Sequence, residues 1–231
     1  MHVSWSEMEM LACKAALGIG VPVGLAEEAG VAVTWLGRAG CSGAAIIWRA
    51  LENISNGRAH PVVIQEKNCL RSKITGTLSS VLYAAPSVTD FLHSVPEIKV
   101  ERLDEPLLLF GYLAASSSML DSGFVFQSNG SGDKCWQGFI ENGYGRIDGQ
   151  LLQDHQEDSG ADVTVTAISA SEDWIRMPDS SEIETRHNIR NTMEVTETEM
   201  INLQRLSAHM LVPETIESKT KGAGAGVVDT D

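Results

Sequence analysis

The turn Gly40-Cys41-Ser42-Gly43 places a thiol and a hydroxyl next to each other, the two groups most often used for nucleophilic catalysis. It nearly matches the nucleophile elbow G-x-S-x-G, but Ala44 replaces the last glycine and a helical pattern precedes it instead of a strand. The motif therefore predicts a turn between two helices, with Ser42 as the N-cap of the second. Because a helix N-terminus favours a thiolate, Cys41 is the candidate reactive thiol, with a lowered pKa.

A second candidate site is the C-terminal segment Arg186-His187-Asn188-Ile189-Arg190. Arg186 and Arg190 are four residues apart, so on a helix they share one face and their guanidinium groups could clamp a carboxylate. His187 could then help to orient the substrate. The alternative is that both arginines form salt bridges with the acidic residues around them, and the sequence leaves both interpretations open.

No motif for a cofactor or a metal is found. The sequence has no G-x-x-x-x-G-K-[ST], no G-x-G-x-x-G after a strand and no H-E-x-x-H, and its six histidines are widely scattered. The cysteines Cys13, Cys41, Cys69 and Cys135 form no C-x-x-C pair. We therefore predict no cofactor and no metal, and free, largely buried thiols. Whether the protein is an enzyme is left undecided.

The charge balance limits the class of partner. The 231 residues include 31 acidic and 17 basic side chains, for a formal net charge of −14. Such a chain repels phosphate backbones and anionic lipids, so we expect neither nucleic acid nor membrane as a partner. The N-terminus lacks the pattern of a secretory signal, and no apolar run approaches the roughly 20 residues of a membrane span. These features predict a soluble, cytoplasmic protein whose partner is a small molecule or a second copy of the chain.

The first third of the sequence is helical. Ser4 and Glu7 have the spacing of a capping box, and apolar residues then recur at helical intervals. A second helix is predicted over about 24–38 and a third from Ala44 to Leu51. Their faces are rich in alanine and glycine, which allows helices to approach closely.

Strands are predicted to follow. The Leu107–Ala115 run is apolar throughout, and we predict a strand because Gly111 and its aromatic neighbours disfavour a helix. A helical turn is predicted over 86–93 and a late helix over 200–210. The predicted strands are 61–65, 98–102, 124–127, 135–140 and 162–169, of which 124–127 and 135–140 form a hairpin.

Helices first, strands next and one late helix last are the order of an α+β fold. We predict a single domain over 1–231, made of a helical segment (1–58) and a strand-rich segment (59–231). In this prediction the N-terminal helical layer packs on a mainly antiparallel sheet.

The C-terminal run Leu206–Asp229, which contains Leu211-Val212-Pro213 and the tract Gly222–Gly226, resembles a bacterial family of unknown function. Together with the helical first third, the resemblance spans most of the chain. It implies a class of protein and no activity. Whether the Gly222–Gly226 tract is ordered is left open.

The first 50 residues resemble the start of the type-2 malate/lactate dehydrogenases in their order of helices and glycine turns. Those enzymes carry Ser-His-Gly at the turn, and the histidine serves as acid and base. Here Ser42 is followed directly by Gly43, so this catalytic position is absent. The chain is also shorter than those enzymes, and their nicotinamide-binding parts cannot be traced.

These observations favour a small-molecule-binding or metabolic accessory protein. One alternative is an enzyme of unrecognised type that acts on a small carboxylate through Arg186, His187 and Arg190. The other is an oligomerisation or interaction protein that pairs subunits through its alanine- and glycine-rich helix faces.

Overall fold

Three helices form the first part of the chain, as predicted, and a short strand that was not predicted precedes them. The computed structural model describes residues 1–66, 68–120, 123–129, 135–147, 160–168 and 192–210. The helices are α1 (Trp5–Gly18), α2 (Val23–Arg38) and α3 (Gly43–Ser55), after β1 (His2–Ser4). The Ser4 hydroxyl accepts a hydrogen bond from the Glu7 backbone N–H at 3.2 Å, which confirms Ser4 as the N-cap of α1.

The small faces of these helices pack within the chain. A Cβ added to Gly30 of α2 would lie 2.7 Å from the Glu9 carbonyl oxygen of α1. One added to Gly18 would meet the Leu206 carbonyl oxygen in the same way. Faces that the sequence suggested for pairing subunits are therefore occupied by neighbouring elements of the same chain.

Among the described residues the main sheet has nine strands, in the order β2-β5-β6-β10-β7-β8-β9, with β4 next to β6 and β3 next to β4. Their bounds are β2 Ala59–His60, β3 Val62–Glu66, β4 Cys69–Ser72, β5 Leu78–Ser79, β6 Glu97–Leu103, β7 Gly123–Asn129, β8 Cys135–Glu141, β9 Tyr144–Ile147 and β10 Ala161–Ile168. The pairs from β6 to β9 and the pair β3–β4 are antiparallel. The fold is thus α+β with a mainly antiparallel sheet, as predicted.

One end of the sheet is parallel. Strand β5 runs parallel to β2 and to β6, and β4 also runs parallel to β6. Helix α4 (Val81–Leu92) connects β5 to β6, so this part of the chain is a β-α-β unit. The sequence indicated only a helical turn over 86–93 for α4, because Pro86 lies inside the helix.

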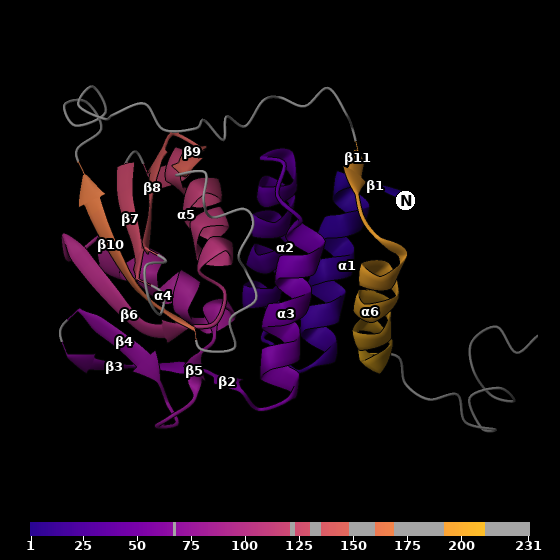
Figure 1. Cartoon of the computed structure of the whole chain (residues 1–231), viewed down its shortest axis with the longest axis horizontal. Coiled ribbons are helices and arrows are strands. Elements are labelled where there is room, and N and C mark those ends of the chain that lie inside the picture. The colour runs from indigo at the N-terminus through magenta and orange to yellow at the C-terminus, as the bar shows by residue number, and fades with distance from the viewer. Residues whose placement is uncertain (67, 121–122, 130–134, 148–159, 169–191, 211–231) are drawn as a thin grey trace, which may run out of the picture.

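The prediction of a strand over Leu107–Ala115 is wrong, because these residues belong to helix α5 (Pro106–Leu120). Proline is well suited to the first position of a helix, since its missing N–H has no partner there in any case. The first ten residues of α5 (106–115) are apolar on all sides, because the helix packs between the sheet and α2 (Figure 1). Gly111 allows the close contact with α2, since a Cβ there would be 2.9 Å from Leu36 Cγ.

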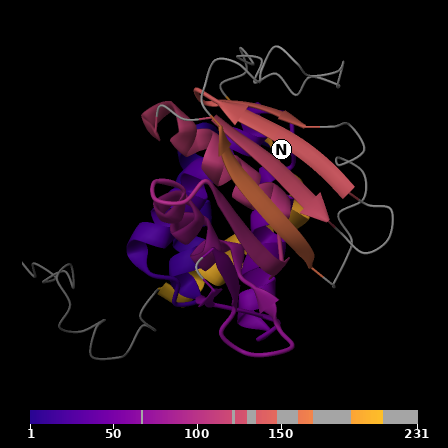
Figure 2. The same ribbon diagram turned by 90° about the vertical axis from the view of Figure 1, so that its left-hand side faces the viewer.

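The predicted hairpin is confirmed by β7 and β8, which pair from Phe124–Ile140 to Asn129–Cys135. Figure 2 shows this part of the sheet with the helices behind it, so the described helices cover one face of the sheet.

The C-terminal helix packs against the N-terminal helices. Strand β11 (Thr192–Glu194) pairs with β1, and α6 (Glu197–Ser207) with a following 3₁₀ turn (Ala208–Met210) lies along α1. Thr196 and Glu199 form the capping box of α6. Residues 192–210, which form the last described elements of the chain, therefore pack against its first elements (Figure 1).

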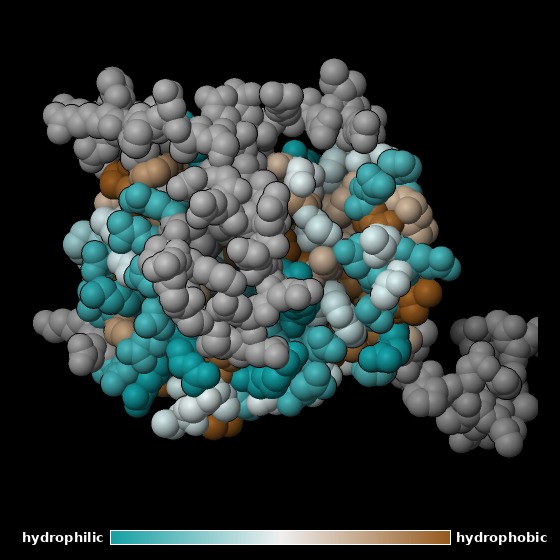
Figure 3. All heavy atoms as spheres, viewed as in Figure 1, coloured by the Kyte–Doolittle hydropathy of each residue, from teal (hydrophilic) through white to brown (hydrophobic). Residues whose placement is uncertain are grey.

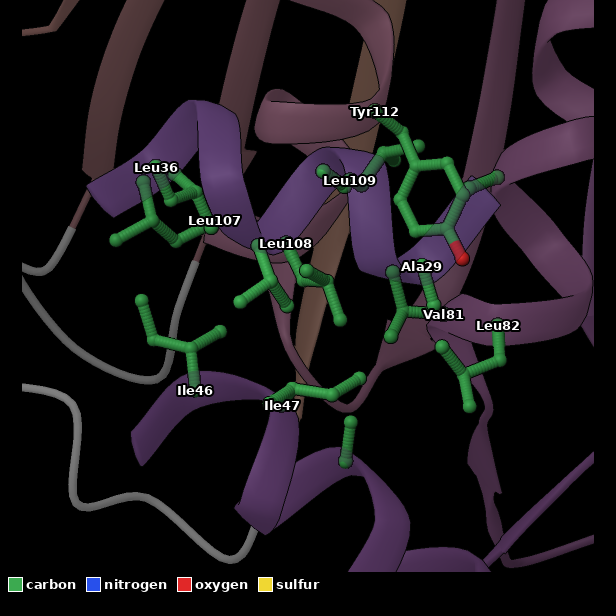
Figure 4. Close-up of a cluster of buried hydrophobic side chains, with 14 of the residues drawn as sticks. Ala29, Leu36, Ile46, Ile47, Val81, Leu82, Leu107, Leu108, Leu109 and Tyr112 are labelled. Carbon is green, nitrogen blue, oxygen red and sulfur yellow. The ribbon is translucent and has the colours of Figure 1, made fainter. Parts of the chain in front are cut away.

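One apolar core joins the helices and the sheet. Figure 4 shows the part of this core where Leu107 and Leu108 of α5 lie opposite Ile46 and Ile47 of α3. On the face shown in Figure 3, the coloured residues are mostly hydrophilic, with separate hydrophobic spots. Within the described residues, no helix is long and apolar enough to cross a membrane.

Candidate functional site

Four polar residues lie at or near the places where the parallel strands β5 and β6 end. The chain leaves β5 through Ser80, the N-cap residue of α4, and leaves β6 through Asp104 and Glu105, which precede α5. Because Ser79 pairs with Leu103, the two exits lie side by side. Arg49 reaches Glu105 from α3. We call Arg49, Ser80, Asp104 and Glu105 the strand-end junction.

Asp104 fixes the geometry of the strand-end junction. Its Oδ1 accepts hydrogen bonds from the backbone N–H groups of Val81 at 2.8 Å and Glu105 at 2.9 Å. Its own backbone N–H donates to the Ser79 carbonyl at 3.0 Å. These bonds connect the end of β5, the first turn of α4 and the start of α5.

The Asp104 carboxyl is almost completely buried, with 6% of the residue exposed. Burial, together with the nearby Glu105 charge, raises its pKa from 3.8 to about 8, although the two backbone hydrogen bonds oppose the change. The group therefore carries a proton at neutral pH. Its second oxygen, Oδ2, is buried and has no hydrogen-bond partner among the described residues.

Glu105 is held by Arg49. The guanidinium donates from Nε to Oε1 at 2.6 Å and from Nη2 to Oε2 at 3.0 Å, a bidentate pair. Burial raises the pKa of Glu105, while Arg49 acts in the opposite direction. The Glu105 side chain is 7% exposed and that of Arg49 is 32% exposed. The ion pair thus extends from the buried strand ends to the surface.

Ser80 is fully buried, and its Oγ also lacks a hydrogen-bond partner among the described residues. Its neighbour Ser79 is satisfied, because the Ser79 hydroxyl donates to the Glu101 carbonyl at 2.6 Å. Two adjacent serines at the end of β5 therefore differ: the Ser79 hydroxyl bonds β5 to β6, whereas the described residues offer the Ser80 hydroxyl no partner.

The backbone before Asp104 is strained. Arg102 has a φ of 49°, which is uncommon outside glycine. Its N–H donates to Asp162 Oδ1 at 2.9 Å, and its Nη1 donates to the Gly76 carbonyl at 2.7 Å. Such strain persists only where surrounding contacts impose it, and it is common near functional sites.

The turn that carries Cys41 and Ser42 joins α2 to α3, as predicted. Ser42 is the N-cap residue of α3, but its hydroxyl makes no capping bond and donates instead to Glu199 Oε1 at 3.1 Å. Cys41 is buried, and burial raises its pKa to about 11. The predicted lowering of the Cys41 pKa is therefore wrong, because loss of hydration outweighs the helix N-terminus.

The other predicted residues cannot be placed. Arg186, His187 and Arg190 lie outside the described residues, as does the Gly222–Gly226 tract.

Cys13, Cys41 and Cys69 are free thiols. In the part of the chain that the structure describes, no cluster of His, Cys, Asp or Glu could hold a metal ion.

Sequence reasoning missed all four residues of the strand-end junction. Asp104-Glu105-Pro106 is a typical helix start, with two acidic residues before a proline. The helix start was not recognised, because a strand was predicted for the Leu107–Ala115 run that follows it. Arg49 and Ser80 carry no local signal, since only the tertiary fold brings them to Glu105 and Asp104.

Comparisons with known proteins agree with the resemblances noted in the sequence. Residues 3–75 match the model of a family described as a protein of unknown function, DUF3726. No curated protein matches the sequence.

Two solved structures of other proteins have a similar fold. A dehydrogenase from Sinorhizobium meliloti matches with a TM-score of 0.57 and 10% identity, covering 90% of this chain and 99% of that one. A sulfolactate dehydrogenase from Methanocaldococcus jannaschii matches with a TM-score of 0.59 and 9% identity, covering 89% and 96%. The resemblance to dehydrogenases is thereby confirmed for the fold.

Proposed function

We propose that this protein binds a small molecule at the strand-end junction. The observation that carries this proposal is the pair of buried polar atoms, Asp104 Oδ2 and Ser80 Oγ, that lack partners among the described residues. A buried polar atom without a hydrogen bond costs about 1–3 kcal/mol, so native proteins rarely leave one unpaired. A ligand with suitable polar groups would satisfy both atoms.

The place of these atoms in the fold supports the proposal. In sheets with parallel strands, ligands bind beyond the carboxyl ends of the strands, next to the N-termini of the helices that follow. Ser80 and Asp104 stand at those ends of β5 and β6. A similar fold is found in a dehydrogenase and in a sulfolactate dehydrogenase.

Arg49 links the buried strand-end junction to the surface, where a ligand could first contact it. About a third of its side chain is exposed, whereas its partner Glu105 is buried. Only Nε and Nη2 of the guanidinium are used by Glu105. The other N–H groups have no partner among the described residues and are available to a ligand.

A thermal-shift screen tests the proposal. The panel contains hydroxy acids, oxo acids, sugar phosphates and nicotinamide dinucleotides. We expect at least one compound to raise the melting temperature of the wild type and to lose this effect in Ser80→Ala. Ser207→Ala, which removes an exposed hydroxyl on α6, is the matched control and should behave as the wild type. A panel without any stabilising compound, or equal shifts in both variants, would contradict the proposal.

A second candidate function is an enzyme that acts on a small carboxylate, with a redox reaction as the first to try. The likeness in fold to two dehydrogenases over about nine tenths of this chain favours it. Against it, the turn at Ser42 has no histidine to act as acid and base. Arg186, His187 and Arg190 remain the residues proposed from the sequence to orient the carboxylate.

The enzyme candidate is tested by mixing the protein with a reduced nicotinamide dinucleotide and a series of 2-oxo acids. Loss of the absorbance of the reduced nicotinamide would support it. The double variant Arg186→Ala/Arg190→Ala should then turn over more slowly. Equal rates, or equal carboxylate-induced thermal shifts, would remove these arginines from the site.

A further inference from the structure

The electrostatic balance of the strand-end junction leaves room for one negative charge. Arg49 and Glu105 neutralise each other in a bidentate pair. The N-termini of α4 and α5 both point their partial positive charge at the same place, where Asp104 Oδ1 accepts from Val81 and Glu105. With a proton on Asp104, these two helix termini face a neutral group.

We infer that the strand-end junction binds a small oxyanion, a carboxylate, sulfonate or phosphate group of a metabolite, and that Asp104 must be protonated for it to bind. The inference rests on the proposed function and specifies its ligand. In the complex the Asp104 hydroxyl and the Ser80 hydroxyl donate hydrogen bonds to the anion. Arg49 supplies a charged donor from the solvent side.

The two unpartnered atoms fit this role. Ser80 Oγ and Asp104 Oδ2 are fully buried and have no partner among the described residues, and Ser80 directly precedes Val81, whose N–H donates to Asp104 Oδ1. A hydroxyl and a protonated carboxyl can each donate to an oxyanion. An ionised Asp104 can only accept, so it would repel the same ligand.

Other ionisable groups around Asp104 do not replace this function. Glu105 is engaged by Arg49 from α3. Tyr112 of α5 is buried and donates its hydroxyl to the Leu25 carbonyl at 3.3 Å, and burial raises its pKa well above 10. On β6, Arg102 directs its guanidinium to the Gly76 carbonyl. Asp104 is therefore the group near the unpartnered Ser80 hydroxyl that titrates close to neutral pH.

The pH dependence follows directly. Burial places the pKa of Asp104 at about 8. Below that pH the proton is already present and anion binding requires none. Above that pH, the Asp104 carboxylate must take up one proton for each anion that binds, so the affinity for the anion falls by up to tenfold per pH unit.

Isothermal titration calorimetry tests the inference with L-lactate, methanesulfonate and inorganic phosphate, used as separate probes. Lactate and methanesulfonate do not titrate in this range, so they report on the protein. We expect binding at about pH 6.5 to weaken about tenfold by about pH 9. Titrations at about pH 9 in two buffers with different ionisation enthalpies should reveal the uptake of close to one proton. Circular dichroism at both pH values verifies that the protein stays folded.

Two variants locate the effect. Asp104→Asn keeps an acceptor for Val81 and Glu105 and a donor that does not titrate, so binding should persist and lose its pH dependence. Arg49→Lys should weaken binding at least about fivefold at both pH values, because lysine lacks the planar donor fork. Arg205→Lys, on the exposed face of α6, is the matched control and should bind as the wild type.

The outcomes separate the inference from the proposed function. If other small molecules bind but none of the three anions does, the inference fails and small-molecule binding stands. Anion binding without proton uptake, unchanged between the two pH values, also overturns the inference alone. If no compound of any class binds, both fail. The relative affinity of the three probes identifies which oxyanion the site prefers.

Discussion

Asp104 and Val81 are joined by a 2.8 Å hydrogen bond from the Val81 backbone N–H to a buried carboxyl oxygen, which fastens the end of β6 to the first turn of α4. The same oxygen also accepts from Glu105 at the start of α5. One side chain therefore satisfies N–H groups at two helix starts, and the strand-end junction depends on it for its shape.

Removing that acceptor should be costly. Asp104→Ala leaves the N–H groups of Val81 and Glu105 buried without a partner, and we expect a loss of about 2–4 kcal/mol in the free energy of unfolding. Asp104→Asn retains the acceptor and, when measured at about pH 4, where ionisation of Asp104 has little effect on stability, should stay within about 1 kcal/mol of the wild type. Urea denaturation followed by circular dichroism measures both. Equal losses in the two variants would show that the acceptor is unimportant.

The same carboxyl should make stability depend on pH. Folding raises the pKa of Asp104 from 3.8 to about 8, so between these values the folded state holds a proton that the unfolded state has released. Stability from this group is therefore full below about pH 4, falls as the pH rises and is lost beyond about pH 8, with a slope of at most about 1.4 kcal/mol per pH unit.

Asp104→Asn isolates this contribution, because asparagine does not titrate. The unfolding free energy of the wild type minus that of Asp104→Asn should decrease steadily as the pH rises from about 5 to about 8. A constant difference over this range would mean that Asp104 ionises at its ordinary pKa.

The pair of Arg49 and Glu105 should be strongly coupled. Arg49→Met leaves the buried Glu105 carboxylate without its cation, which typically costs about 3–5 kcal/mol. Adding Glu105→Met should restore most of the loss, since a neutral apolar pair needs no charge compensation. A double-mutant cycle by chemical denaturation measures the coupling. Additive effects would show that the bidentate geometry contributes little to stability.

Gly111 should be intolerant of a side chain. A Cβ at this position would lie 2.9 Å from Leu36 Cγ and 3.1 Å from the Ala32 carbonyl oxygen, so Gly111→Ala should destabilise the protein by about 1–3 kcal/mol. Gly24→Ala in α2 is the control, because nothing lies within 4 Å of its Cβ position. That variant should be neutral or slightly stabilising in thermal denaturation. Similar effects in both would contradict close packing of α5 on α2.

Cys41 should react slowly. With its pKa raised to about 11 by burial, its thiolate fraction at neutral pH is more than about 100-fold below that of an ordinary cysteine. Iodoacetamide labelling of the native protein, mapped by mass spectrometry against a free cysteine peptide, measures the difference. Labelling as fast as that of the peptide would restore Cys41 as a candidate nucleophile.

Local patterns in the sequence sufficed for the amphipathic helices and the hairpins. Ser4 and Thr196 are residue types that favour a helix N-cap, and each caps its helix. The apolar residues over 5–18 recur on one face of α1, and the opposite face is exposed to solvent. Helix α5 could not be recognised in this way, because its residues 106–114 are all buried and show no polar stripe. For such a run, periodicity does not distinguish a buried helix from a central strand.

The candidate site was beyond local patterns for a different reason. Ser80 and Asp104 are 24 residues apart in the numbering and meet only because β5 and β6 pair in parallel. Burial, which determines whether Asp104 holds a proton, is a property of the assembled core. At Cys41 the sequence indicated a helix N-terminus correctly, but burial reversed the expected shift of its pKa.

The most direct test of ligand binding at the strand-end junction is a titration of ¹⁵N-labelled protein with the compound that binds most tightly in the thermal-shift and calorimetric experiments, followed by backbone amide shifts. We predict saturable shifts that are largest for the amides of Val81 and Glu105 and for the Arg49 side-chain Nε–H. Amides of α6, such as that of Arg205, should not move. Saturable shifts confined to other elements, or no shifts at these three groups, would contradict the assignment of the site.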